Sequence, residues 1–421
     1  MNNLKPRKLT HKILNFIEDR EIIVLHGSRQ VGKTSLLYLI MDDLRTKVSA
    51  DNIFYFDLED FALLDLCNAG IEKVISFLKA KKADFGKKVY LFIDEVQYLN
   101  NPSSFLKLFY DRYRDQIKLI VSGSSSFLIK KKFKESLAGR IVDFELFTLD
   151  FDEFLEFKGL KYDLKEDLPE ALQNEMRDLY KEFVLYGGYP AIVLEDSIEK
   201  KEIKLKQIIN AYIRRDIRDF AEIREIDKFN NLVRVLASQV GNLLNIMELF
   251  TTLGLAKKTI EEYIFLLENT YIIRRIKPFH RNIRGELSKM PKVYFEDTGL
   301  ANILANKTFS LELSGGLLEN SIYSQFRKNL CVDDIYFWRT NKQQEVDFVI
   351  DSINRKQKRV FSAVEVKAIF LNKYISSIRY LKSKYGDLKT YFCCLDKKEE
   401  CKDKDVNIVY PWQMLHFLNY D

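Results

Sequence analysis

The sequence predicts an α/β protein of several domains, beginning with a parallel β-sheet whose strands are joined by helices. Its 421 residues exceed what one core usually organises, since domains hold roughly 150 residues. Between Glu21 and Phe147, short apolar runs alternate with longer amphipathic stretches. That alternation is typical of buried parallel strands with crossover helices. We therefore expect residues 1–150 to form an α/β domain.

The composition excludes several classes of protein. Hydrophobic residues make up 47% and charged residues 30%, which is typical of a globular chain rather than a disordered one. No apolar run reaches the length of a membrane span, and the N-terminus lacks a signal-peptide core, so we expect a cytoplasmic protein with no membrane partner. The net charge of +6 does not decide the partner. The five cysteines show no spacing typical of disulfides or zinc.

Three further regions follow the first domain. Residues 151–225 are dense in Leu, Glu, Lys and Arg at helical spacing and predict a helical lid. Residues 226–305 predict three helices and a β-hairpin in the order of a winged helix-turn-helix. Residues 306–421 return to alternating strands and helices and predict a second, smaller α/β domain. The strands expected in the first domain are Ile22–Leu25, Ile53–Phe56, Val89–Ile93, Leu119–Val121 and Ile141–Leu146.

A phosphate-binding loop directly follows the first strand. The pattern GxxxxGK[ST], between a strand and a helix, is typical of a P-loop that binds ATP. Its glycines allow a curved backbone around the phosphates, Lys33 reaches the β- and γ-phosphates, and Thr34 ligates Mg²⁺. The residues expected to bind the nucleotide are Gly27, Ser28, Arg29, Gln30, Val31, Gly32, Lys33, Thr34 and Ser35.

The strand Tyr90–Ile93 ends in Asp94 and Glu95, as a Walker B strand does. A strand buried on both faces delivers carboxylates at its C-terminal end, where open α/β sheets bind ligands. Asp94 is expected in the Mg²⁺ shell and Glu95 beside the attacking water. The next strand ends in hydroxyl side chains, so Ser122 or Ser124 is a candidate to touch the γ-phosphate; the alternative is the capped start of a helix.

Arg140 stands at the corner before the fifth strand. If subunits form a ring, Arg140 could enter a neighbour's site as an arginine finger. The alternative is an ion pair within one subunit.

These motifs together resemble the AAA+ ATPases of bacteria and archaea that carry a C-terminal domain of unknown function. The resemblance continues through Tyr186–Pro190, Tyr294–Leu300 and Leu318–Asn320 and covers nearly the whole chain. It implies an ATPase core, a winged helix and a terminal domain of restriction-endonuclease type. It names no substrate.

The terminal domain resembles the PD-(D/E)xK nuclease core in two strands, Glu345–Phe348 and Val364–Lys367. Glu365 and Lys367 are two apart on a strand and face the same side. Asp347 and Glu365 could share Mg²⁺ while Lys367 stabilises the developing charge, and Glu319 could complete the site. An acid and a lysine on a solvated strand face are the alternative.

Basic residues decorate the expected winged helix and suggest a surface for DNA phosphates. The alternative is that this module packs against protein, since Glu261 and Glu262 would repel a phosphate. We therefore expect an ATPase acting on DNA; the rival is an ATP-controlled switch that works through protein partners, with the nuclease-like domain inactive. The basic residues are Lys257, Lys258, Arg274, Arg275, Lys277, Arg281 and Arg284.

Overall fold

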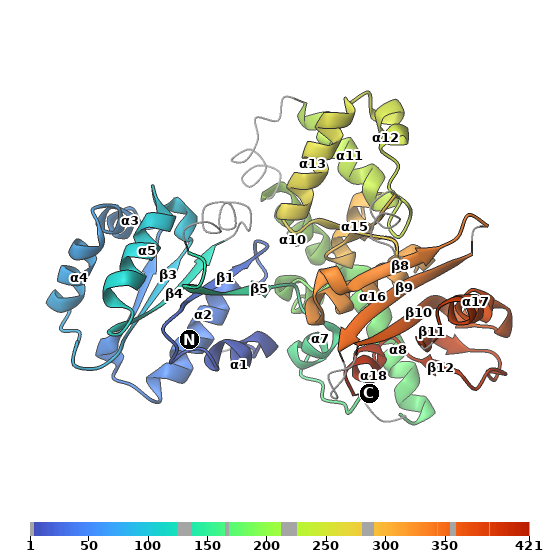
Figure 1. The fold of residues 1–421 in the computed structure, drawn as a ribbon, viewed down its shortest axis with the longest axis horizontal. Coiled ribbons are helices and arrows are strands. Elements are labelled where there is room, and N and C mark those ends of the chain that lie inside the picture. Colours follow the sequence, from blue (N-terminus) through green and yellow to red (C-terminus); the bar gives the residue numbers. More distant parts are fainter. Residues whose placement is uncertain are drawn as a thin grey trace. The chain divides into compact units, whose positions relative to one another are not determined.

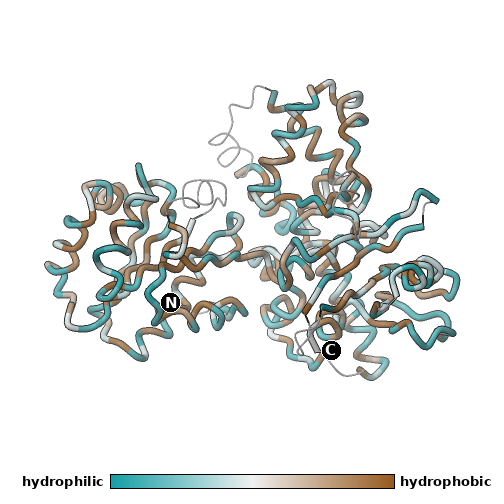
Figure 2. Tube along the Cα trace, in the orientation of Figure 1, coloured by the Kyte–Doolittle hydropathy of each residue, from teal (hydrophilic) through white to brown (hydrophobic). Residues whose placement is uncertain are grey.

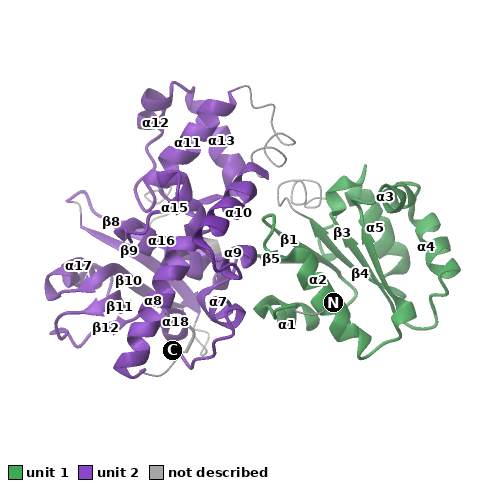
Figure 3. Ribbon diagram, turned by 180° about the vertical axis from the view of Figure 1, so that it is seen from behind, with its two compact units in different colours: residues 1–147 green, residues 148–421 purple. Residues whose placement is uncertain are grey.

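The computed structural model describes residues 4–420, except 124–136, 165–167, 212–224, 280–289, 343, 354–358 and 387. The chain divides into two compact units, residues 1–147 and residues 148–421 (Figure 3). None of the helices built from the described residues is long and apolar enough to cross a bilayer.

Unit 1 contains a five-stranded parallel sheet, as expected (Figure 1). The strand order is β2-β3-β4-β1-β5, with every pairing parallel and, for example, Ile23 beside Ile120. Every residue of the three inner strands is buried, whereas the edge strands are partly exposed. The strands are β1 (Ile22–Gly27), β2 (Ile53–Asp57), β3 (Val89–Asp94), β4 (Ile117–Gly123) and β5 (Ile141–Leu146).

The core of unit 1 joins one face of this sheet to three helices. Alternate residues of β1, β3 and β4 pack there against Val74, Leu106 and Phe109, and hydrophobic colouring predominates in the interior of unit 1 in Figure 2. The last helix starts at Pro102, behind an Asn101 cap, as Pro favours the first helical position. The helices of unit 1 are α1 (Lys8–Leu14), α2 (Lys33–Arg45), α3 (Phe61–Asn68), α4 (Ile71–Ala80) and α5 (Pro102–Tyr113), with 3-10 turns η1 (Ala50–Asn52) and η2 (Val96–Tyr98).

Unit 2 begins with the helices expected to form a lid. The first of them starts in a capping box made by Asp150 and Glu153. Tyr180 is fully buried and its hydroxyl lies 2.9 Å from the Ser321 hydroxyl of a later helix, so these helices share the interior of unit 2. They are α7 (Phe151–Phe157), α8 (Glu170–Tyr186), α9 (Pro190–Val193) and α10 (Ile198–Ala211).

Three helices and a two-stranded antiparallel sheet follow, in the order expected from the sequence. The second helix is capped by the Asn245 side chain and ends at Gly254 in the left-handed conformation. The identity of this segment as a winged helix stays a prediction. Its elements are α11 (Ile226–Ser238), α12 (Ile246–Leu253), α13 (Lys257–Asn269), β6 (Ile273–Ile276) and β7 (Lys292–Phe295), followed by α15 (Thr298–Asn306).

The terminal part of unit 2 is a mixed five-stranded sheet in the order β12-β11-β10-β9-β8. β10 pairs antiparallel with β9 and parallel with β11, which confirms a second α/β region. Its elements are α16 (Gly315–Asn329), η4 (Val332–Asp334), β8 (Ile335–Arg339), β9 (Glu345–Ile353), β10 (Arg359–Phe370), η5 (Asn372–Ile375), α17 (Ser376–Tyr385), β11 (Leu388–Lys397), β12 (Val406–Val409) and α18 (Met414–Tyr420).

Asp297 and three glycines form a tight junction inside unit 2. The Asp297 carboxylate accepts hydrogen bonds from the amides of Gly188 at 2.8 Å and Leu300 at 3.2 Å, which caps α15. A Cβ on Gly188 or Gly299 would lie less than 3.0 Å from a backbone oxygen, and one on Gly187 equally close to the Asp297 carboxylate. Only glycine therefore permits this approach. The motifs Tyr186–Pro190 and Tyr294–Leu300 thus meet in space.

Candidate nucleotide site and carboxylate cluster

The P-loop connects the end of β1 to the start of α2, and two of its positions favour glycine for different reasons. A Cβ on Gly27 would lie less than 3.0 Å from the Leu146 carbonyl oxygen of β5. Gly32, just before the helix, has a φ of 97°, which favours glycine, and Gln30 also adopts a positive φ of 59°. The loop therefore delivers a helix N-terminus directly behind the buried strand, an arrangement that favours anions.

Lys33 folds back over this loop. Its ammonium donates to the carbonyl oxygens of Gly27 at 3.0 Å and Ser28 at 2.8 Å, and the residue is 6% exposed. The positive charge is thus held at the loop, where a phosphate would be neutralised.

Arg7, which sequence reasoning did not single out, supports the loop from the N-terminal segment. Its guanidinium donates to the carbonyl oxygens of Val31 at 2.7 Å and Phe147 at 2.9 Å. Because Arg7 is distant in sequence from both carbonyl groups, no local sequence pattern indicates these contacts.

Asp94 is the centre of a buried hydrogen-bond network at the end of β3. Its carboxylate accepts from the Thr34 hydroxyl at 2.6 Å, from the Tyr55 hydroxyl at 3.0 Å and from the Ser122 hydroxyl. Burial, then the charge of Asp94, raises the pKa of Tyr55, so the phenol stays a donor at neutral pH. The structure thus brings together Thr34, Asp94 and Ser122; Ser124 lies outside the described residues.

Glu95 follows Asp94 in a left-handed conformation, with a φ of 56°. Its carboxylate accepts a hydrogen bond from the side-chain amide of Gln97. Because a non-glycine residue rarely adopts this φ, the backbone at Glu95 is locally constrained. The predicted base therefore has a partner, Gln97, that the motif alone did not assign.

Arg140 forms an ion pair within unit 1. Its guanidinium lies 3.0 Å from the Asp111 carboxylate and over the Tyr110 ring, 5.9 Å from the ring centroid. The intramolecular alternative is thus present in the structure. A role toward a neighbouring subunit would require this pair to open.

The side chains around the P-loop are suited to bind Mg²⁺ and a nucleoside triphosphate. Thr34 and Asp94 provide adjacent hydroxyl and carboxylate oxygens, which are the ligand types Mg²⁺ prefers. Lys33 and the N-terminus of α2 supply positive charge for phosphates. The motif residues converge at one edge of the sheet, as the strand order requires.

The four predicted nuclease residues also meet, in unit 2. Phe348 of β9 pairs with Val364 of β10, so their neighbours Asp347 and Glu365 lie side by side. The Lys367 ammonium lies 2.6 Å from Glu365 and 3.1 Å from Asp347. Glu319 of α16 is buried beside these residues. Its burial, and then the charge of Asp347, raise the pKa of the Glu319 carboxyl to about 7.

Lys292, at the start of β7, belongs to the same cluster and was not predicted. Its ammonium lies 2.6 Å from Glu345, 2.9 Å from Glu319 and 3.9 Å from Asp347. Those carboxylates raise the pKa of Lys292 against its burial, so the side chain is charged. Glu319 also accepts from the Tyr294 hydroxyl at 2.5 Å.

As arranged, the cluster does not fit a metal ion. Among the described residues, no group of three or more His, Cys, Asp or Glu side chains could hold one. The carboxylates are bound instead by the ammonium groups of Lys292 and Lys367.

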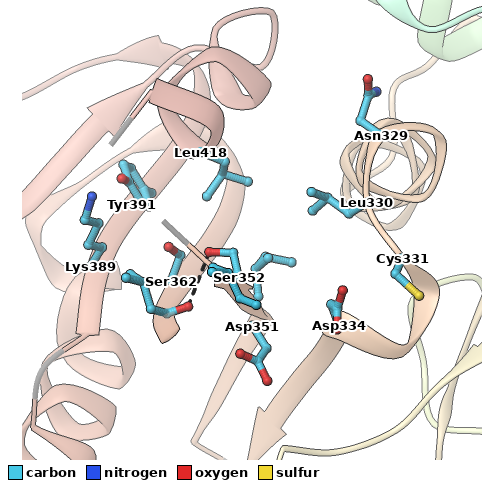
Figure 4. A pocket seen from close by; sticks show the side chains of 13 residues that line it. Asn329, Leu330, Cys331, Asp334, Asp351, Ser352, Ser362, Lys389, Tyr391 and Leu418 are labelled. Atoms are coloured by element: carbon cyan, nitrogen blue, oxygen red, sulfur yellow. Dashed lines mark hydrogen bonds between the residues drawn. The ribbon is translucent and has the colours of Figure 1, made fainter. Parts of the chain in front are cut away.

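A separate cavity of about 400 Å³ lies beside the end of α16 and the strands β9 to β11 (Figure 4). Its lining includes Asp334, Asp351, Ser362 and Lys389. None of the predicted nuclease residues lines it, so it is distinct from the carboxylate cluster.

Part of the basic surface expected on residues 226–305 is engaged in ion pairs. Arg275 contacts Glu268 at 2.8 Å and Glu261 at 2.9 Å, and Arg274 lies 3.9 Å from Glu296. These pairs reduce the positive charge available to a phosphate. Lys257, Lys258 and Lys277 are exposed, whereas Arg281 and Arg284 lie outside the described residues.

Three family models match successive parts of the chain. Residues 19–155 match a family model described as an AAA domain. Residues 19–155 form an AAA domain. Behind the AAA domain, residues 177–310 and 314–415 match two models described as domains of unknown function, DUF8612 and DUF4143. The expected combination of an AAA domain with a C-terminal domain of unknown function is thus confirmed.

The relatives of this AAA-domain chain carry no described activity. An uncharacterized protein of Methanocaldococcus jannaschii is 29% identical over 371 residues, covering 85% of this chain and 79% of the relative. One of Haemophilus influenzae is 26% identical over 295 residues, covering 69% and 70%. Among solved structures, a Walker-type ATPase of Pyrococcus abyssi has a TM-score of 0.45 at 16% identity, covering 71% of this chain and 95% of that one. The ORC1 protein of Aeropyrum pernix in complex with DNA has a TM-score of 0.32 at 11% identity, covering 72% and 93%.

Proposed function

We propose that this chain binds ATP with Mg²⁺ at the P-loop of its AAA domain and hydrolyses it. The observation that carries the proposal is the contact between Thr34 and Asp94, 2.6 Å apart although they are distant in sequence. A hydroxyl after the P-loop lysine and a carboxylate at the end of β3 are the pair that holds Mg²⁺ in P-loop NTPases.

Each side chain of the site then has a defined task. Lys33 neutralises phosphate oxygens, and Thr34 and Asp94 hold Mg²⁺, which supplies charge stabilisation when bound. Ser122 and Tyr55 fix the orientation of the Asp94 carboxylate. Glu95 accepts the proton of the attacking water, while Gln97 bonds one oxygen of its carboxylate.

The proposal is tested by replacing Glu95 with Gln. The amide keeps the shape but cannot take a proton, so ATP binding should persist while phosphate release falls by about a hundredfold or more. Glu59→Gln is a matched control, because Glu59 is a nearby exposed carboxylate outside the site. Unchanged phosphate release by Glu95→Gln would remove Glu95 from its role.

We infer further that unit 2 brings this ATPase to DNA, through residues 226–305 as a winged helix and residues 306–421 as a nuclease-like domain. Support comes from the order of three helices and a hairpin, and from the exposed Lys257 and Lys258. Duplex affinity should fall steeply with salt and weaken in Lys257→Ala/Lys258→Ala. Salt-independent binding, or none, would contradict the inference.

The alternative function is a nucleotide-controlled switch that acts on protein partners. The ion pairs that engage Arg274 and Arg275 favour it, because they reduce the charge left for DNA. Cleavage of DNA by Asp347, Glu365 and Lys367, with Glu319, stays a prediction. Incubating wild type and Asp347→Ala with duplex, branched and single-stranded DNA tests it, and cleavage by wild type alone would establish it.

A further inference from the structure

Lys292 lies at the middle of the carboxylate cluster although it comes from a different element. It is the first residue of β7, and its side chain is 2% exposed. Its ammonium contacts Glu319 of α16 and Glu345 of β9, and lies 3.9 Å from Asp347. A cation thus already stands among the side chains expected to share a metal ion.

The two oxygens of the Asp347 carboxylate face different lysines. Oδ1 faces Lys292, while Oδ2 accepts from the Lys367 ammonium at 3.1 Å and from the Val366 amide at 2.8 Å. Glu365 Oε1 lies 2.6 Å from Lys367, whereas its buried Oε2 has no hydrogen-bond partner among the described residues. The carboxylates that a metal would need are therefore bound by ammonium groups.

Buried carboxylates at this spacing require a counter-charge. Four acidic side chains, Glu319, Glu345, Asp347 and Glu365, face the two lysines and Arg339, which lies 3.2 Å from Glu345. Desolvated like charges repel strongly unless a cation lies between them or a proton neutralises one of them. Lys292 supplies that cation for Glu319. No other basic side chain of the described residues forms an ion pair with Glu319.

The backbone around Lys292 is held in place by neighbouring segments, and from it the buried side chain reaches Glu319 and Glu345. The Gly241 amide donates to the Val293 carbonyl at 2.9 Å, and the Leu244 amide to the Pro291 carbonyl at 2.7 Å. Asn320 holds the far end of β7 by bonding both the amide and the carbonyl of Phe295. Withdrawal of the lysine side chain would break its ion pairs with Glu319 and Glu345.

We propose that Lys292 is the resident cation of this cluster and keeps it closed to divalent metal ions. An ammonium neutralises carboxylates but cannot act as a Lewis acid toward a phosphate. The inference concerns the residues of the proposed nuclease-like domain and limits that proposal: metal-dependent cleavage would first require Lys292 to leave.

The test measures Mn²⁺ binding to the full chain in an Asp94→Asn background, which silences the nucleotide site. Lys292→Met keeps most of the length of the side chain and removes its charge. Lys292→Arg keeps the charge. We expect Lys292→Met to bind Mn²⁺ at least about tenfold more tightly than the parent and Lys292→Arg, and Asp347→Asn to abolish the gain. Equal affinity of Lys292→Met and the parent, including binding by neither, would overturn the proposal.

A second variant tests the proposal even if Lys292→Met fails to fold. Lys292→Met/Glu319→Gln also removes the carboxylate left unpaired, and Mn²⁺ should raise its thermal midpoint more than that of Glu319→Gln alone. Equal shifts would count against the proposal. A Lys292→Met protein that binds Mn²⁺ without cleaving DNA would end the nuclease prediction and leave the role of Lys292 intact.

Discussion

At the level of single residues, the Asp94 carboxylate joins several elements of unit 1, because the hydroxyls of Thr34, Tyr55 and Ser122 all donate to it. Lys33, Thr34, Asp94 and Glu95 could be predicted because strand, loop and helix surround each of them in sequence. Tyr55 reaches Asp94 from another strand, and nothing near Tyr55 in the sequence indicates this contact. Lys292 was missed for the same reason, because only the packing of β7 brings it to the acidic residues.

The Tyr55 hydroxyl should contribute to turnover. Tyr55→Phe removes one donor to the Asp94 carboxylate, and a hydrogen bond to a charged group is worth about 1.5–3 kcal/mol. We expect phosphate release to fall by about tenfold, with the fold unchanged. Tyr90→Phe is the matched control, since the Tyr90 hydroxyl bonds Glu18 instead. Equal effects of both substitutions would contradict a role for Tyr55 at Asp94.

The buried Glu365 should make stability depend on pH. Burial, then the Asp347 charge, raises its pKa from 4.5 to about 8, so the folded chain holds a proton that the unfolded chain releases between these values. Stability should therefore fall as pH rises from about 5 to about 8. Glu365→Gln should show a smaller fall in thermal midpoint over that range. An equal fall in variant and wild type would show that Glu365 does not carry the proton.

At the scale of elements, alternation and length predicted the five strands of unit 1, because buried parallel strands are nearly continuous apolar runs. The order β2-β3-β4-β1-β5 is set by tertiary packing. The role of Gly187, Gly188 and Asp297 could not be predicted, since it depends on a close approach of α8 to α15. A glycine pair alone indicates only a turn.

This junction should tolerate no side chain. Gly299→Ala places a Cβ less than 3.0 Å from the Tyr186 carbonyl oxygen, and we expect a loss of about 2–4 kcal/mol in the free energy of unfolding. Gly315→Ala, also in the first turn of a helix, has open space around its Cβ and should be neutral or stabilising. Denaturant unfolding of both variants measures the difference, and a stable Gly299→Ala protein would refute the close approach.

At the scale of the whole molecule, the sequence predicted the AAA domain and a C-terminal domain of unknown function. The division into four domains, with a lid at residues 151–225, stays a prediction; the structure groups residues 148–421 into one compact unit. Helical spacing identified the helices of that region, but it carries no information on which core they join.

Mixing variants of different subunits distinguishes the two roles considered for Arg140, an arginine finger in a neighbour's site and an ion pair with Asp111. If Arg140 leaves Asp111 and completes a neighbour's site, mixing Arg140→Ala with Lys33→Ala protein should restore part of the activity, because one kind of mixed interface has an intact P-loop and an intact arginine. Asp111→Ala, which frees the arginine, should retain activity. Mixed oligomers, verified by mass, that show no recovery would assign Arg140 to the ion pair with Asp111.

The central claim is that the AAA domain hydrolyses ATP with the side chains at its P-loop. The most direct measurement is phosphate release from ATP and Mg²⁺ by the intact chain, compared with Lys33→Ala and with Lys47→Ala at the other end of α2. We expect turnover by wild type and Lys47→Ala and none by Lys33→Ala, whose fold is checked by circular dichroism. Equal phosphate release by wild type and Lys33→Ala, or none by a folded wild type that binds ATP, would contradict it.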